Sequence, residues 1–294
     1  MSDLPRRIGG SSDYWLYHPS TGYDLTRSHT PRLSLTTTTS QPITICPSTT
    51  ALIIIDMQNF FLNPAAGRPF NPTAHAAEKK LLDVAIPACN DSGIQVVYLT
   101  WGITVEGLEV LPPALFRGFG AVLEGNLQDV DGGRMEERFG ERPTVGEDMG
   151  DVAEEGDIPV PGGRLLMRDQ WNTSLHPPMQ ASFDSSQRLQ KPDVRFHKAH
   201  ISGFTSPNLP IVQFLRQKGI KSLLFSGVNT DQCVLASLQD AAAMGFDAVL
   251  LRDGSATGSP EYARQMAEFN CRKSWGFVTT CDALQAGVKN MMYQ

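Results

Sequence analysis

The sequence predicts an α/β fold of three layers, in which helices cover both faces of a central, mainly parallel sheet. Apolar runs such as 50–55 and 220–228 lack a polar alternation, which is typical of strands buried on both faces. Amphipathic segments of helical spacing lie between these runs, and several end at a glycine, a common helix stop. Because strand and helix alternate along the chain, we expect a parallel sheet.

The first strand–helix–strand unit is predicted over residues 50–101. "TTALIIID" is a run of β-preferring residues that ends at Asp56. Residues 76–93 have helical spacing and end at Gly93, and residues 94–101, "IQVVYLTW", form the next strand. This arrangement predicts two neighbouring parallel strands with a helix between them.

A second α/β run is predicted from residue 208 onward. Its elements are a helix over 208–219, a strand over 220–228, a helix from about 230, a strand over 246–257, a helix over 259–276, and a final short strand and helix. In the helix over 259–276, Ser259 is the expected N-cap and Pro260 the first helical residue. The pattern predicts one three-layer α/β domain over residues 49–294.

Two segments depart from this rhythm. Residues 1–48 are rich in Ser, Thr and Pro and are predicted to be an irregular N-terminal extension. Its aromatic stretch "DYWLYH" is expected to pack across the domain or onto a neighbouring subunit. An acidic insertion is predicted at about 120–160, since residues 124–157 hold twelve acidic residues and three arginines, or 3 − 12 = −9. Such a composition favours a solvated surface segment, and its spacing does not match an EF-hand.

Composition limits the class of protein. The 294 residues carry a net charge of −6, which argues against nucleic acid or an anionic membrane as the partner. No apolar stretch of 18 residues and no N-terminal apolar segment typical of a secretory signal is present. The five cysteines form no C-x-x-C pair, which indicates free thiols in a reducing compartment. We therefore expect a cytoplasmic protein.

Two side chains are predicted to meet at the carboxyl ends of strands, where sites form in open α/β sheets. Asp56 ends an otherwise apolar run, and Cys233 follows a strand and a short polar turn, "VNTD". A thiol near a helix N-terminus has a lowered pKa, and the free N–H groups there can receive an oxyanion. The alternative interpretations are a cysteine that packs as a small apolar residue and an aspartate that caps a loop.

A third candidate is Lys198 in "FHKAHISGF". It would hold Asp56 in place and bias its charge, or contact the substrate, whereas the alternative is an ordinary surface lysine. His197 and His200 flank it, but on a regular strand they do not both point inward with the lysine. A catalytic Cys–His pair is therefore disfavoured.

Three stretches together resemble the isochorismatase-like cysteine hydrolases, a family that includes nicotinamidases and N-carbamoylsarcosine amidohydrolases. They are "ALIIIDMQNFF", "HKAHISGF" and "LFSGVNTDQCVLASLQDAAAMGFDAVLLRDGSAT". The resemblance covers about 50–101 and 193–284. It implies Cys233 as the nucleophile, Asp56 as the general base and Lys198 as the third member of a triad. It also implies a cis Val228–Asn229 peptide, an oxyanion hole formed by the N–H groups of Asn229 and Cys233, and a homo-oligomer.

The chain also departs from some members of that family. Nicotinamidases bind a metal through an Asp-x-His pair, and the sequence contains no such pair, so no catalytic metal and no cofactor are expected. Isochorismatases that cleave a vinyl ether lack the cysteine, so Cys233 favours acyl transfer.

The predicted function is thus hydrolysis of a C–N bond in a small amide, carbamoyl or imide-like compound through a Cys thioester. The alternatives are a vinyl-ether hydrolase that uses Asp56 alone and a non-catalytic member that keeps the fold. The expected pocket residues, which follow strand ends or lie in loops, are Phe61, Trp101, Trp171, Asn172 and Gln232.

Overall fold

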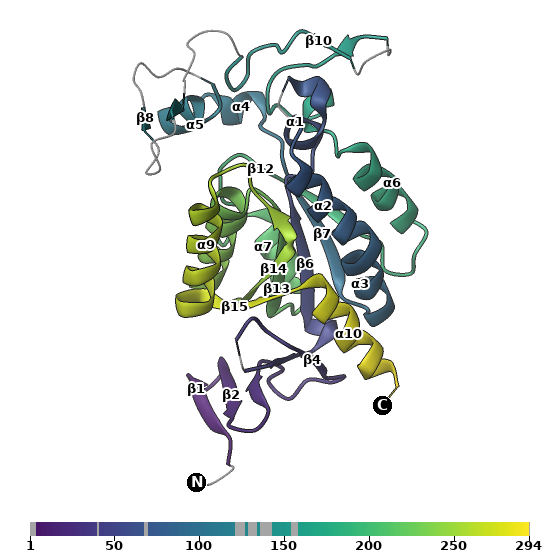
Figure 1. The fold of residues 1–294 in the computed structure, drawn as a ribbon, viewed down its shortest axis with the longest axis vertical. Coiled ribbons are helices and arrows are strands. Elements are labelled where there is room, and N and C mark those ends of the chain that lie inside the picture. Colours follow the sequence, from purple (N-terminus) through teal and green to yellow (C-terminus); the bar gives the residue numbers. More distant parts are fainter. Residues whose placement is uncertain are drawn as a thin grey trace.

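The computed structural model describes residues 4–39, 41–67, 70–120, 127–128, 134–135, 143–153 and 158–293 (Figure 1). Most of the predicted acidic insertion, including nine of its twelve acidic residues, lies outside these ranges. In the described part of the chain, no helix is long and apolar enough to cross a membrane.

A six-stranded parallel sheet forms the centre of the molecule, which confirms the predicted fold class. Its strands are β6 (Thr50–Ile55), β7 (Gln95–Trp101), β12 (Val194–Lys198), β13 (Ser222–Val228), β14 (Asp247–Ala256) and β15 (Gly276–Thr279). Their spatial order is β12-β7-β6-β13-β14-β15. The chain builds outward from β6 in one direction and then from β13 in the other, so these two neighbours mark the topological switch point.

Helices cover both faces of the sheet (Figure 1). One face carries α2 (Pro72–Lys80), α3 (Ile86–Ser92), α6 (Pro177–Ser186) and α10 (Cys281–Met292), and the other carries α7 (Pro210–Gln217), α8 (Leu235–Ala243) and α9 (Glu261–Asn270). Strand β6 is buried along its whole length: Ile53 and Ile55 belong to one core, and Leu52 and Ile54 to the other. The unbroken apolar run is therefore explained by burial on two faces.

Two predicted helix starts were placed differently in the structure. α2 begins at Pro72, four residues before the predicted start, because the Asn71 side chain accepts hydrogen bonds from the N–H groups of Thr73 and Ala74. A turn of π-helix, Leu81–Ala85, joins α2 to α3. α9 begins after Pro260, which takes the N-cap position predicted for Ser259.

The prediction of an irregular N-terminal extension was wrong. Residues 6–45 form a five-stranded sheet, in the order β1 (Arg6–Gly9), β2 (Tyr14–His18), β3 (Gly22–Asp24), β5 (Ile43–Ile45) and β4 (Leu33–Leu35). In "LSL" and "ITI" the outer residues are fully buried, so alternation over only three residues is enough to bury one face. Helix α10 packs closely on β4, since a Cβ at Gly287 would lie 2.5 Å from the carbonyl oxygen of Ser34.

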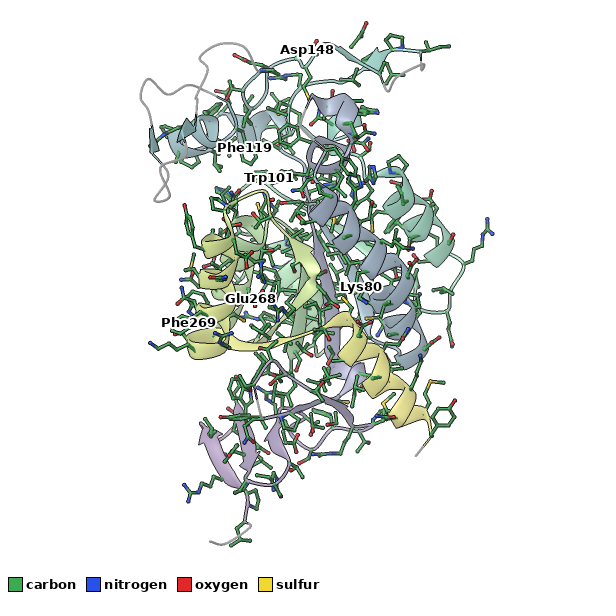
Figure 2. All side chains as sticks on the ribbon, in the orientation of Figure 1. Lys80, Trp101, Phe119, Asp148, Glu268 and Phe269 are labelled. Carbon is green, nitrogen blue, oxygen red and sulfur yellow. The ribbon has the colours of Figure 1, made fainter. Side chains whose placement is uncertain are left out.

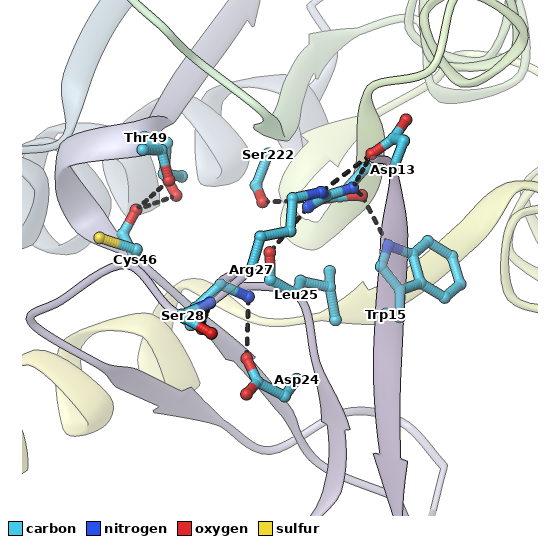
Figure 3. Close-up of polar contacts among 12 residues, drawn as sticks. Asp13, Trp15, Asp24, Leu25, Arg27, Ser28, Cys46, Thr49 and Ser222 are labelled. Atoms are coloured by element: carbon cyan, nitrogen blue, oxygen red, sulfur yellow. Dashed lines mark hydrogen bonds and ion pairs between the residues drawn. The ribbon is translucent and has the colours of Figure 1, made fainter. Parts of the chain in front are cut away.

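A buried polar network fastens this small sheet to the main domain (Figure 3). The Arg27 guanidinium donates two hydrogen bonds to Asp247, of 2.7 and 2.8 Å, and also contacts Asp13. Trp15 and Ser222 each donate a further hydrogen bond to the Asp247 carboxylate, at 2.6 and 2.8 Å. The aromatic stretch thus packs on its own domain, where the Trp15 ring also lies against Phe277.

Short elements lie beyond the opposite end of the sheet, above the carboxyl ends of its strands (Figure 1). They are α1 (Asn59–Leu62), α4 (Val105–Leu108), α5 (Pro113–Gly118), β8 (Leu127–Gln128), β9 (Arg134–Met135), β10 (Asp151–Val152) and β11 (Val160–Pro161), with the 3-10 turns Pro64–Ala66 and Trp171–Thr173 in the connections. A further 3-10 turn, Pro47–Thr49, directly precedes β6 at the amino end of the sheet. Only three of the acidic residues of the insertion, Glu147, Asp148 and Asp151, lie in the described part.

Candidate active site

Asp56 lies directly after β6 and has no exposed surface. Its backbone adopts the left-handed region, with φ 55°, and its N–H donates to the carbonyl of Leu99 at 3.0 Å. Non-glycine residues rarely adopt this backbone conformation, and the surrounding structure must hold them in it. The strand end and the tight turn therefore fix where the carboxylate points.

Cys233 lies in the first helical turn after β13. Residues Thr230–Val234 form a turn of π-helix that leads into α8, and the Cys233 side chain is 3% exposed. The Val228–Asn229 peptide just before this turn is cis. Asn229 occupies the N-cap position without a capping side-chain hydrogen bond. The thiol is thus at a helix start, as predicted, and also buried.

Lys198 joins these two groups from the end of β12. Its ammonium nitrogen lies 3.0 Å from Oδ2 of Asp56 and 3.5 Å from Sγ of Cys233. It also donates to the carbonyl of His200 at 3.2 Å and sits 3.7 Å from the centroid of the Trp101 ring. The alternative of an ordinary surface lysine is excluded by this burial, since Lys198 is 5% exposed.

The three groups come together at the switch point of the sheet. β6 and β13 are adjacent and parallel, so the residues that follow them face the same end. Lys198 reaches the same point from β12, two strands away from β6. Ligands in open α/β sheets bind beside the carboxyl ends of strands at such a point.

Burial dominates the electrostatics of the cluster. It raises the pKa of Asp56, while Lys198, Cys233 and Trp101 oppose the shift by favouring the carboxylate. Burial also raises the pKa of the Cys233 thiol to about 12, despite the nearby ammonium of Lys198. The prediction that the helix start lowers this thiol pKa was therefore wrong for the free protein, because desolvation outweighs the helix dipole and the cation.

Gln58 is a site residue that the sequence interpretation missed. Its buried side chain donates to the carbonyls of Trp101 and Thr173 and accepts from the N–H of Trp101. It thereby connects the ends of β6 and β7 to the turn at 171–173. Its only signal in the sequence is a polar residue two positions after Asp56 in an apolar run.

Two of the expected pocket aromatics contact the cluster or its surroundings. Trp101 is fully buried as the last residue of β7, so its ring forms a wall under Lys198 instead of a roof. Figure 2 shows Phe119 close to Trp101, and the two rings meet edge to face at 5.1 Å. Phe61 is half-buried and packs against both core clusters.

The other expected pocket residues are placed less favourably. Asn172 is fully buried, and its amide is used within the chain: it donates to the carbonyls of Gly162 and Arg164 and accepts from the N–H of Leu166. The Asn172 amide thus shapes the loop, and its predicted contact with a substrate stays a prediction. Gln232 is exposed and hydrogen-bonds to Asn229 and Ser259. The half-buried Trp171 accepts a hydrogen bond from Asn59 at its carbonyl.

The flanking histidines are not part of the cluster. His197 lies 3.1 Å from the Thr100 hydroxyl through Nδ1, and burial lowers its pKa to about 4. His200 meets Lys198 only through its carbonyl. In the described part of the chain, the one group of side chains close enough to share a metal ion is His75, Glu78 and His176, none of which belongs to this cluster.

Comparison with known proteins shows which family the chain resembles. Residues 161–283 match the model of the isochorismatase domain. This segment of the chain is similar to an isochorismatase domain. The matched segment contains Lys198 and Cys233, whereas Asp56 precedes it. The predicted family resemblance is confirmed.

Curated relatives match the chain over most of its length. It is 27% identical to the ureidoacrylate amidohydrolase RutB of Caulobacter segnis over 247 residues, which covers 82% of the chain and 86% of the relative. The identity to ureidoacrylate amidohydrolase RutB of Caulobacter vibrioides is also 27%, with 82% and 91% covered.

Solved structures share its fold at lower identity. A cysteine hydrolase from Pseudomonas syringae superposes with a TM-score of 0.57 at 16% identity, covering 90% of this chain and all of the other. N-carbamoylsarcosine amidase from Thermoplasma acidophilum gives a TM-score of 0.51 at 17% identity, with 80% and 97% covered. These matches establish the isochorismatase-type fold of the chain.

Proposed function

We propose that this protein is a cysteine hydrolase that cleaves the C–N bond of a small amide or carbamoyl compound. The observation that carries the proposal is the buried contact of Lys198 with both Asp56 and Cys233, at 3.0 and 3.5 Å. The likeness to ureidoacrylate amidohydrolase supports a non-peptide C–N bond as the target and a ureido compound as the first substrate to test.

The first half of the proposed reaction forms a thioester. The Asp56 carboxylate takes the proton of the Cys233 thiol as the sulfur attacks the substrate carbonyl carbon. The N–H groups of Asn229 and Cys233 receive the resulting oxyanion. The tetrahedral intermediate then collapses, the C–N bond breaks, and Asp56 returns the proton to the leaving amine.

The second half restores the enzyme. Asp56 removes a proton from water, and the hydroxide attacks the thioester carbon. The C–S bond breaks, the acid leaves, and Cys233 regains its proton from Asp56. In this scheme Lys198 is a positioning residue that keeps the carboxylate charged in a buried site until the thiol proton arrives.

Trapping the intermediate tests the proposal. The wild-type protein is mixed with a panel of ureido acids and primary amides, ammonia release is measured, and intact mass is recorded after acid quenching. We expect turnover of at least one ureido or amide compound and a mass increase that maps to Cys233. C233A should lose turnover and the adduct together, and full activity in C233A would refute the thioester mechanism.

A further inference from the structure

A second cluster of ionisable side chains contacts the main chain of residues 57–62, the segment that follows Asp56. His75 and Glu78 are one turn apart on α2, and His176 directly precedes α6. The three side chains each offer one ligand atom, and these atoms lie within 4.8 Å of one another. Glu78 is buried, while the side chains of His75 and His176 are 22% and 12% exposed. A small ion from solvent can therefore reach them.

The hydrogen bonds of His75 fix which ring nitrogen is free. Nε2 of His75 lies 3.1 Å from the carbonyl oxygen of Leu62. Since a carbonyl only accepts, this nitrogen carries the proton, and in a neutral ring Nδ1 has a free lone pair. Nδ1 faces Oε2 of Glu78 at 3.6 Å, which is too long for a hydrogen bond. Two electron-rich atoms thus face each other across a gap.

The second carboxylate oxygen of Glu78 faces the other imidazole. Oε1 lies 2.6 Å from Nδ1 of His176. The rings of the two histidines are 5.4 Å apart and inclined at 67°, so both Nδ1 atoms converge on one carboxylate. A positive charge between these three side chains can be supplied either by protons or by a metal ion.

We propose that His75, Glu78 and His176 bind a divalent metal ion of zinc type, at a site separate from Cys233. Two imidazoles and one carboxylate form a ligand set that zinc accepts with tetrahedral geometry and a water in the fourth position. A metal-bound histidine usually donates its other N–H to a carbonyl, which His75 does towards Leu62. Binding needs His176 in the tautomer with its proton on Nε2, or release of one proton.

The ion would stiffen the segment that leads from Asp56 to α2. Leu62 accepts from His75 through its carbonyl, and the carbonyl of Met57, next to Asp56, accepts from the N–H of His176 at 3.0 Å. The ligands therefore connect α2, the start of α6 and both ends of the 57–62 segment. We expect the ion to stabilise the 57–62 segment and to take no part in bond cleavage.

Metal binding to the full chain tests the proposal directly. The protein is stripped with a chelator and titrated with Zn²⁺ by calorimetry, and bound zinc is counted after dialysis. We expect one Zn²⁺ per chain and a rise in Tm of roughly 5 °C at a hundredfold excess over Kd. Co²⁺ should give the intense visible absorption of a tetrahedral site. A weak site has a Kd of about 0.1 mM. If no saturable binding is found up to this Zn²⁺ concentration, the proposal is overturned, and the three side chains form only a hydrogen-bonded His–Glu–His contact.

Matched variants locate the site. Glu78→Gln keeps the size of the side chain and should weaken Zn²⁺ binding at least tenfold. If this variant does not fold, His75→Gln gives the same test, because it changes a more exposed ligand. His29→Gln changes an exposed histidine and C233A removes a thiol ligand, so both should keep the wild-type Kd. Loss of binding in C233A with full binding in Glu78→Gln would assign the zinc to the catalytic cysteine and refute the proposal.

Discussion

Asp56, Lys198 and Cys233 form a buried set in which one cation faces two acidic groups. Because burial penalises a second negative charge, the set holds a carboxylate or a thiolate beside Lys198, not both. The pKa of about 12 for Cys233 keeps the proton on sulfur at neutral pH. The nucleophile is thus expected to form only while the proton moves to Asp56 during attack.

Replacing Asp56 with Asn tests this dependence. D56N keeps the shape of the side chain but cannot accept the thiol proton, so we expect kcat/KM to fall roughly 10³-fold, within the range of general base catalysis. Alkylation of Cys233 by iodoacetamide should slow as well. D83N, which changes a carboxylate that is 54% exposed, should retain wild-type values for both measurements. Equal alkylation rates in D56N and wild type would contradict the assignment of the base.

The pH dependence of kcat/KM reports the same carboxylate. Asp56 must be ionised to accept the proton, so activity is lost as the pH falls through its pKa. Because burial raises that pKa, the acidic limb should lie above pH 3.8, the ordinary value for aspartate. His197, with a pKa of about 4, is neutral at neutral pH, so H197N should leave the acidic limb in place. Loss of that limb in H197N would assign it to the histidine.

At the scale of elements, β12 has a buried ionisable side chain at each end. Lys198 is its last residue, and Asp193 immediately precedes its first residue, Val194. Asp193 is 3% exposed, and its Oδ2 has no hydrogen-bond partner. Burial raises its pKa to about 6. Ionisation of this buried carboxylate therefore destabilises the folded state, because the charge is removed from water without a full set of hydrogen bonds.

Replacing Asp193 with Asn should remove that cost. The folded-state pKa of about 6 lies above the ordinary value of 3.8, so the wild type loses stability as the pH rises from 3.8 through 6 and stays penalised above it. D193N should raise Tm by a few degrees at pH 8 and have little effect at pH 4, as measured by scanning calorimetry. The exposed change D184N should shift Tm little at either pH, and a D193N effect that is independent of pH would contradict this account.

The long apolar strands of the central sheet are those that the sequence predicts. β6 and β13 follow from unbroken apolar runs, and the carboxyl-end rule brings Asp56 and Cys233 to one point once these strands are neighbours. The order of strands is not contained in any local pattern, so the contact of Lys198 from β12 needs either the family resemblance or the structure.

Other features could not be found from local patterns. Strands of three residues, such as β4 and β5, are too short to show a period in a sequence window. The ion-binding cluster joins α2 to His176, about a hundred residues later along the chain, and its only local signal is the spacing of His75 and Glu78. The hydrogen-bond partners of the Gln58 side chain are main-chain groups. Every residue has such groups, so the sequence gives no sign of which ones Gln58 contacts.

At the scale of the whole molecule, the N-terminal sheet and the catalytic cluster lie at opposite ends of the central sheet (Figure 1). Asp247 and Ser222 are the first residues of β14 and β13, whereas Asp56 and Cys233 follow the last residues of β6 and β13. Because the small sheet is attached far from Asp56 and Cys233, its attachment should affect stability more than chemistry.

The expected homo-oligomer stays a prediction, and light scattering on the full chain would show its stoichiometry.

Removing the Arg27 side chain separates the effect of the small sheet on stability from its effect on chemistry. The side chains of Arg27 and Asp247 are 8% and 2% exposed, so R27A leaves a buried carboxylate with only Trp15 and Ser222 as donors. Loss of one partner of a buried ion pair costs about 3 kcal/mol, which urea denaturation would measure. K79A breaks an ion pair whose lysine is 78% exposed and should cost about 0.5 kcal/mol or less. Because the network lies at the amino ends of the strands, R27A should keep wild-type kcat/KM while it stays folded. A large loss of kcat/KM in folded R27A would show instead that the N-terminal sheet contributes to the active site.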